Sequence, residues 1–226
     1  MELTKELKEL LQEKGAGLVG IGHMEGIKNC VFETGVSVAI PLPKNIVMDL
    51  REAPTKEYYE MYYSLNSRLN KIVTEGERFL KSKGFEAYAQ VTERVEINEK
   101  YISKLPHKTV ATRSGMGWIG KNGLLVTKPY GSAIRISSLL TNAPLECGEP
   151  VEKSMCGACM ICVKNCPAQA LTGALWTAGM ERDELVDVNK CYKKQREIMK
   201  KSTGIETDLC GKCFAVCAYT RKYVSA

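Results

Sequence analysis

The sequence predicts an α/β fold for residues 1–149, a mixed α+β domain, followed by a small domain over residues 150–226 that is organised by cysteines. Two observations predict this division. Helical and strand periodicities alternate up to about residue 142, whereas eight of the ten cysteines fall between Cys156 and Cys217. With 226 residues, 44% of them hydrophobic and 26% charged, the chain can bury a core and has an ordinary globular composition.

The first domain is expected to begin with an amphipathic helix and two apolar strands. A helix over about residues 2–14, ended by Gly15, has an apolar face made of Leu3, Leu7, Leu10 and Leu11. Residues 17–24 predict a short buried strand, and residues 35–43 a second strand that proline ends.

A long helix and further strands complete this domain. Apolar and aromatic residues recur at three- and four-residue steps from Pro54 onward, and Gly84 ends the predicted helix. Residues 85–92 alternate as a strand does. The stretch GLLVTKPYGSAIRISSL (123–139) predicts a β-hairpin that turns at Pro129–Gly131.

The cellular location follows from the absence of two signals. No apolar stretch approaches the roughly 18–20 residues that cross a bilayer, and the first helix has no apolar h-region of a signal peptide. A cytoplasmic protein with no membrane partner is therefore expected. In that compartment ten cysteines favour metal binding over a disulfide framework.

The cysteine spacing predicts a ferredoxin-like domain with two [4Fe–4S] clusters. CGACMICVKNCP (156–167) has the bacterial ferredoxin spacing, in which the fourth cysteine ligates the other cluster. A lone cysteine and the run CGKCFAVC (210–217) supply the second half. Exchanging the fourth ligands gives two sets: Cys156, Cys159, Cys162 and Cys217 for one cluster, and Cys166, Cys191, Cys210 and Cys213 for the other. Zinc is the alternative, but this spacing differs from that of paired zinc knuckles.

The positive formal net charge of the chain is only weak support for a polyanionic partner. The formal charge of +6 counts every cysteine as neutral, and two clusters with four thiolates each, at about −2 apiece, would reduce it to about +2. The basic stretch KCYKKQREIMKK (190–201) is read as a solvated helix face, with phosphate contact as the alternative.

The chain resembles the epoxyqueuosine reductases in LPHKTVATRSGMGWIGKNGLLV (105–126), in the following YGS, and in the eight-cysteine block. The resemblance runs from the first strand to about Tyr219. It implies a cytoplasmic enzyme with a cobalamin-binding α/β domain and two [4Fe–4S] clusters, a cofactor set that reductive dehalogenases share. It further implies base-off cobalamin and an external electron donor of the ferredoxin or flavodoxin type.

Two departures from the family bear on the substrate. The helical repeats that help to hold tRNA in these enzymes do not follow residue 226 in this sequence. Counting back from Trp118 to the position of the family's catalytic aspartate gives Tyr101. A tyrosine hydroxyl can still donate a proton, as in reductive dehalogenases, so Tyr101 is the predicted catalytic acid. A small-molecule substrate is expected, and nucleic acid is not.

The glycine-rich loop and the residues before it are the predicted cofactor contacts. Glycines allow close backbone approach to a large ligand, and the loop adds a flat ring and side-chain donors. With the resemblance, the predicted cobalamin-binding residues are His107, Lys108, Arg113, Gly117, Trp118, Ile119, Gly120, Lys121 and Asn122. The alternative is a tight turn that packs on the cluster domain and binds no ligand.

Three functions remain in view. The first is a reductase that passes electrons through two clusters to cobalamin and reduces a small electrophilic substrate. The second is a two-cluster electron carrier that donates to a separate partner, which could be a corrinoid protein. The third is a nucleic-acid-modifying subunit that uses residues 190–201.

Overall fold

The computed structural model describes residues 2–99 and 102–226, which divide into two compact units. The first unit comprises Met1–Ile40, Ser64–Met116 and Arg135–Val151, and the second comprises Pro41–Tyr63, Gly117–Ile134 and Glu152–Ala226. Two earlier segments group with the C-terminal residues, so the units are interleaved along the chain.

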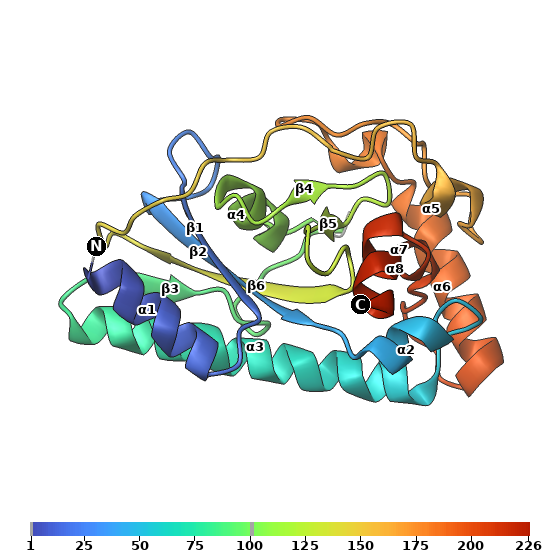
Figure 1. The fold of residues 1–226 in the computed structure, drawn as a ribbon, viewed down its shortest axis with the longest axis horizontal. Coiled ribbons are helices and arrows are strands. Elements are labelled where there is room, and N and C mark those ends of the chain that lie inside the picture. Colours follow the sequence, from blue (N-terminus) through green and yellow to red (C-terminus); the bar gives the residue numbers. More distant parts are fainter. Residues whose placement is uncertain (1, 100–101) are drawn as a thin grey trace. The chain divides into compact units, whose positions relative to one another are not determined.

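The chain has the expected mixed α/β character (Figure 1). In chain order the elements are α1 (Glu2–Glu13), β1 (Leu18–His23), β2 (Thr34–Pro41), α2 (Lys44–Asp49), α3 (Lys56–Ser82), β3 (Ala87–Ala89), α4 (His107–Arg113), β4 (Trp118–Ile119), β5 (Leu125–Val126), β6 (Ile134–Thr141), α5 (Ile161–Lys164), the 3₁₀ turn η1 (Arg182–Glu184), α6 (Val188–Thr203), α7 (Lys212–Ala215) and α8 (Ala218–Ser225). None of the helices in the described ranges is long and apolar enough to cross a membrane.

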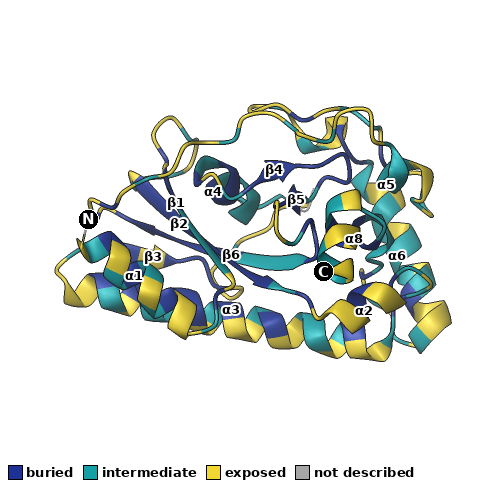
Figure 2. Cartoon of the chain, viewed as in Figure 1, coloured by how far each residue is buried: buried dark blue, intermediate teal, exposed yellow. Residues whose placement is uncertain are grey.

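A four-stranded sheet in the order β1-β2-β6-β3 forms the centre of the first unit. Strands β1 and β2 are antiparallel, with Ile21 opposite Val36, and β3 and β6 are antiparallel, with Tyr88 opposite Leu140. The burial pattern in Figure 2 shows β2 as an almost continuous buried strand, because helices cover both of its faces.

One face of this sheet is built of small residues so that α4 can approach it. A Cβ atom added to Gly20 would lie 2.5 Å from the Ser114 hydroxyl oxygen, and one added to Gly22 would collide with the Arg113 carbonyl. Gly35, opposite Gly22 in the register, similarly leaves room for the Val110 side chain. The C-terminal half of α4 can thus lie against β1 and β2 because these glycines have no side chains there.

The opposite face carries the larger apolar residues. Leu7 and Leu11 of α1 are fully buried, as is Leu139 of β6. A Cβ atom at Gly76 of α3 would approach side chains of all three of these leucines, at 2.6 Å from the nearest. The predicted helices over 2–14 and 54–84 are therefore confirmed, and both pack their apolar face on this sheet.

The predicted hairpin over residues 123–139 is wrong in its pairing. Strand β5 pairs instead with β4, with Trp118 opposite Val126, and β6 joins the four-stranded sheet of the first unit. The turn itself exists, because Thr127 and Gly131 form an isolated bridge that closes it. Strands β5 and β6 do not pair with each other after this turn, because β6 lies between β2 and β3 in the four-stranded sheet.

The second unit consists of short helices around the β4–β5 hairpin. Helix α8 contacts both α2 and α7, and α7 also contacts α5. Helix α6 begins where the Asp187 carboxylate accepts a hydrogen bond from the Lys190 backbone amide, and it ends at Gly204 in the left-handed conformation.

Candidate functional site

All eight cysteines of the predicted ligand sets lie in the second unit, whereas Cys30 and Cys147 lie in the first. Helix α5 contains Cys162, α6 contains Cys191 and α7 contains Cys213, while the other five cysteines lie in loops or at helix ends. Cys30 and Cys147 are in neither of the predicted ligand sets, and we interpret them as ordinary thiols.

A tight turn follows Cys156 and another follows Cys210, and each precedes the next cysteine in the chain. Gly157 (φ 51°) follows Cys156, and Gly211 (φ 81°) follows Cys210. A positive φ suits glycine, so each turn can bring its flanking cysteines to the same side of the backbone. A Cβ atom at Gly211 would also lie 2.8 Å from the Leu50 side chain, which makes glycine doubly necessary at this position.

Cys162 lies at the centre of one set of sulfurs. Burial, together with the neighbouring thiols of Cys217, Cys156 and Cys159, raises the pKa of the Cys162 thiol to about 11. Such an effect requires that the four sulfurs lie close together. We call Cys156, Cys159, Cys162 and Cys217 the first cysteine group.

The other four sulfurs form a second set. Burial raises the pKa of Cys191, and Cys166 and Cys210 add to the increase. The pKa of Cys213 is raised by burial and by Cys210, Cys191, Cys162 and Cys166. We call Cys166, Cys191, Cys210 and Cys213 the second cysteine group. Cys213 is also influenced by Cys162, so the two groups are adjacent.

The sulfurs accept hydrogen bonds that suit thiolates. The backbone amides of Thr220 and Tyr219 donate to Cys217 and lower its pKa against the effect of burial. The Gln195 side-chain amide donates to the Cys191 sulfur at 3.0 Å. N–H donors around thiolate sulfurs are a feature that tunes iron–sulfur centres. No group of three or more His, Cys, Asp or Glu residues within the described ranges is arranged to hold a single metal ion.

The glycine-rich loop is largely explained by its own packing. Trp118 is buried, with its ring against Tyr219 in an edge-to-face contact at 4.9 Å. The side-chain amide of Asn122 donates to Ser132, and its carbonyl oxygen accepts from the Leu124 backbone amide.

The glycines and the lysine of this loop are enclosed as well. A Cβ atom at Gly117 would collide with the Val126 carbonyl, and one at Gly120 would lie 2.7 Å from the Asn122 amide oxygen. Ile119 and Lys121 are also buried. The packed-turn alternative therefore describes Trp118 and Asn122, and a cobalamin contact for the loop residues stays a prediction.

Helix α4 presents the other predicted cofactor contacts, in the first unit. His107 Nδ1 lies 2.8 Å from the Ser138 hydroxyl, and burial together with the charge of Arg135 lowers the pKa of His107 to about 4. The imidazole is therefore neutral at physiological pH. The Arg113 guanidinium donates to the His23 carbonyl at 2.8 Å, and Lys108 is half-buried. Tyr101, the predicted catalytic acid, lies outside the described residues.

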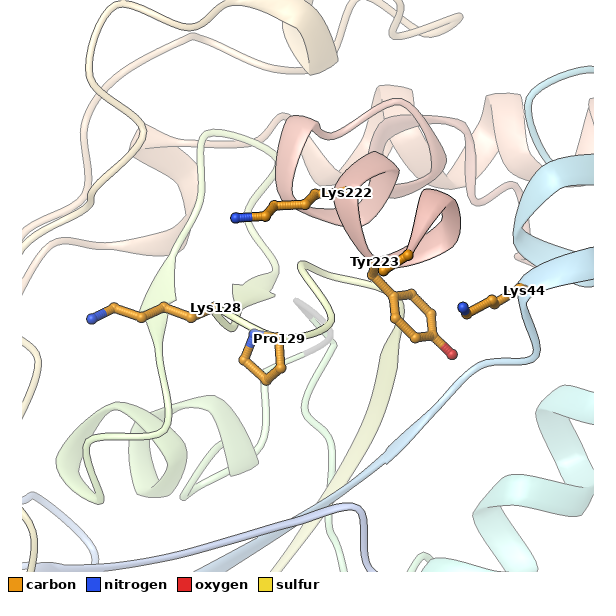
Figure 3. A pocket seen from close by; sticks show the side chains of 6 residues that line it. Lys44, Lys128, Pro129, Lys222 and Tyr223 are labelled. Carbon is orange, nitrogen blue, oxygen red and sulfur yellow. The ribbon is translucent and has the colours of Figure 1, made fainter.

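A cavity of about 550 Å³ in the second unit was not predicted from the sequence. Figure 3 shows its lining, which comes from three segments far apart in the chain: Lys44, Lys128, Pro129, Lys222, Tyr223 and Ala226. The Lys44 ammonium lies 5.5 Å from the centre of the Tyr223 ring, and the Tyr223 hydroxyl donates to the Leu42 carbonyl. No motif marks these positions, because only the fold brings them together.

Comparison with known proteins supports the resemblance seen in the sequence, although no family model matches the chain. The epoxyqueuosine reductase of Lactococcus garvieae (strain Lg2) is 37% identical over 119 residues, which make up 50% of this chain and 31% of that protein. The epoxyqueuosine reductase of Synechocystis sp. (strain ATCC 27184 / PCC 6803 / Kazusa) is 31% identical over 130 residues, 53% of this chain and 41% of that protein. The matches thus span less than half the length of these relatives.

Solved structures share the fold over nearly the whole chain. An epoxyqueuosine reductase bound to an epoxyqueuosine-modified tRNA-Tyr stem loop matches with a TM-score of 0.67 and 20% identity, over 97% of this chain and 66% of that one. A catabolic reductive dehalogenase in complex with 3-bromo-4-hydroxybenzoic acid matches with a TM-score of 0.75 and 18% identity, over 95% of this chain and 31% of that one. The chain is therefore epoxyqueuosine reductase-like in sequence and in fold.

Proposed function

We propose that this protein is a reductase that passes electrons through two [4Fe–4S] clusters to cobalamin, which acts on an electrophilic substrate. The observation that supports the proposal is that the thiols of Cys217, Cys156 and Cys159 raise the pKa of Cys162, whereas those of Cys210, Cys191, Cys162 and Cys166 raise the pKa of Cys213. Apart from Cys162, the neighbours of Cys213 are those expected from the crossed ligand pattern of two-cluster ferredoxins. The similarity to enzymes named as reductases favours this function over that of a simple electron carrier.

The first and second cysteine groups fit the role of cluster ligands. Apart from the exposed Cys159, all of their cysteines are partly buried, and amide donors already face Cys217 and Cys191. The clusters, when bound, supply one-electron transfer. Because the groups adjoin at Cys162 and Cys213, an electron from an external donor of the ferredoxin or flavodoxin type has a short path between them.

The residues proposed to bind cobalamin differ in how well they suit this role. Trp118 and Asn122 have their ring and amide engaged within the second unit. In the first unit His107, Lys108 and Arg113 offer a neutral imidazole and two cationic donors for the amide and phosphate groups of such a cofactor. Cobalamin, when bound, supplies a strongly reducing, nucleophilic cobalt centre.

Tyr101 is the proposed proton donor. Its phenol would supply a proton to the leaving group or the product. Replacement of Tyr101 by phenylalanine removes the hydroxyl and keeps the ring, so turnover of an identified substrate should fall while cluster content and cobalamin binding remain. Full activity of Tyr101→Phe would eliminate this role.

The function is tested by anaerobic reconstitution with iron and sulfide, followed by EPR spectroscopy with cob(II)alamin. About eight irons per chain and a base-off cobalt spectrum are expected. About eight irons with a cobalt spectrum identical to that of free cob(II)alamin would refute the reductase proposal and favour the carrier. An iron content near zero would refute both.

A tRNA substrate is a second candidate, because one structural neighbour was solved with a modified tRNA stem loop. This observation weighs against the sequence-based expectation that nucleic acid is not a partner. Reduction assays should therefore compare epoxyqueuosine-containing tRNA with small halogenated phenols. Binding of tRNA that weakens steeply with salt would support the RNA substrate, whereas turnover of the small molecules alone would support the original expectation.

A further inference from the structure

The β4–β5 hairpin holds two buried hydrogen-bond donors that lack ordinary partners. The Trp118 indole Nε1 has no hydrogen-bond partner anywhere in the described part of the chain. Lys121 is only 5% exposed, and among the described residues its ammonium donates only to the Met160 thioether, at 3.3 Å. The contacts of the two groups do not compensate for the free energy that it costs to bury them.

The cost is clearest for the lysine. Burying a charged group is unfavourable unless an opposite charge and hydrogen bonds compensate for it. A thioether is a weak acceptor and carries no charge. A buried indole N–H without an acceptor also costs free energy, because its bond to water is lost and not replaced. Together the two groups indicate a negatively charged acceptor that none of the described residues provides.

Both side chains contact segments that carry the first cysteine group. Met160, which faces Lys121, lies between Cys159 and Cys162 in the chain. Tyr219, which faces Trp118, donates its backbone amide to the Cys217 sulfur. The β4–β5 hairpin therefore contacts both of the chain segments that contribute cysteines to the first cysteine group.

We propose that the hairpin forms the outer shell of the cluster held by the first cysteine group, an inference that rests on the cluster assignment above. Lys121 is the counter-charge of this cluster, and Trp118 Nε1 donates a hydrogen bond to one of its sulfurs. With four thiolates the cluster carries about −2 and becomes more negative on reduction. A buried cation and a donor both stabilise the reduced state, so they raise its reduction potential.

The test is an anaerobic redox titration monitored by EPR, after iron has been counted for each variant. The variants are Lys121→Met, which removes the charge, Lys121→Arg, which keeps it, and Trp118→Phe, which removes the N–H but keeps a ring against Tyr219. Lys164→Met is the matched control. Lys164 lies two residues after Cys162 but is exposed, so water and salt screen its charge.

The expected result is that Lys121→Met and Trp118→Phe both shift the same midpoint potential to a more negative value. Lys121→Arg should stay nearer the wild type, and Lys164→Met should match it. Loss of about four irons in Lys121→Met but not in Lys121→Arg would also support the counter-charge.

Three results would overturn the inference. The first is unchanged potentials in Lys121→Met and Trp118→Phe at full iron content. The second is that Lys121→Arg behaves like Lys121→Met, and the third is that Lys164→Met shifts as far as Lys121→Met. A wild-type protein that binds no clusters would instead refute the proposed function itself, and that outcome is visible in the iron count before any titration.

Discussion

His107 provides a quantitative test of the first unit, because its surroundings hold it neutral. Its ring nitrogen meets the Ser138 hydroxyl, which also accepts a hydrogen bond from the Gln90 side-chain amide. Burial, and to a smaller extent the charge of Arg135, lower the pKa of His107 from 6.5 to about 4. The unfolded chain has no such environment, so its imidazole binds a proton at a higher pH than the folded one does.

The sign of the pH dependence follows from this difference. When pH falls below about 6.5 the unfolded state gains a proton that the folded state does not, and the folded state is destabilised until the pH reaches about 4. One pKa unit corresponds to 1.36 kcal/mol, so the full effect is about 3 kcal/mol and the part reached at pH 5 is about 2 kcal/mol. The stability present above the unfolded pKa is thus lost on acidification.

Two measurements check this value. The sequence contains only His23 and His107, so carbon–proton correlation NMR gives two imidazole signals that a His107→Gln variant assigns. The His107 signal should titrate near pH 4 in the folded protein. Urea unfolding at pH 7.5 and pH 5 should then show that wild type loses about 2 kcal/mol more than His107→Gln does.

Substitution of Arg135 distinguishes the two causes of the low His107 pKa, burial and a neighbouring positive charge. Arg135→Gln removes the positive charge but leaves the ring buried, so it should raise the His107 pKa only part of the way toward 6.5, because burial is the larger cause. A His107 signal that titrates near 6.5 in wild type would refute the reasoning altogether. An equal acid sensitivity of wild type and His107→Gln would refute the linkage to stability.

The remaining predictions concern the second unit and its turns. Gly131→Ala should destabilise strongly, because the new Cβ atom would collide with the Thr220 backbone at a φ of 58°, and Gly26→Ala, with a φ of 75° and open space around it, should cost much less in thermal unfolding. Equal losses would show that backbone strain alone matters. Asp187→Ala removes the cap on the Lys190 amide and should cost about 1 kcal/mol in urea unfolding. Asp187→Asn should recover most of that loss, and an equally destabilised Asp187→Asn would contradict the cap.

Local patterns predicted the features that depend on nearby residues. The helices α1 and α3 follow from leucine and aromatic spacing together with Gly15 and Gly84, which take positive φ values of 103° and 88°. Short-range chemistry decides where both helices begin and end. The division of the eight cysteines into two groups stays a prediction from the crossed spacing, and the neighbours of Cys162 are consistent with it.

The pairing of strands that are far apart in the chain could not be predicted from the sequence. The sequence predicts a hairpin of β6 with β5, but the buried C-terminal half of β6 pairs with β3. Strands β4 and β5 have only two residues each, too few for alternation to reveal. The interleaving of the two units and the burial of Trp118 likewise depend on contacts between distant segments, for which one sequence carries no local signal.

The position of the last three cysteines has a consequence for biosynthesis. Cys217 belongs to the first cysteine group, whereas Cys210 and Cys213 belong to the second. A nascent chain that has not passed residue 209 therefore offers three thiols for one centre and two for the other. Neither group is complete before Cys213 and Cys217 have been translated. Under the proposed cluster assignment, iron is therefore delivered only after all residues of the first unit have been synthesised.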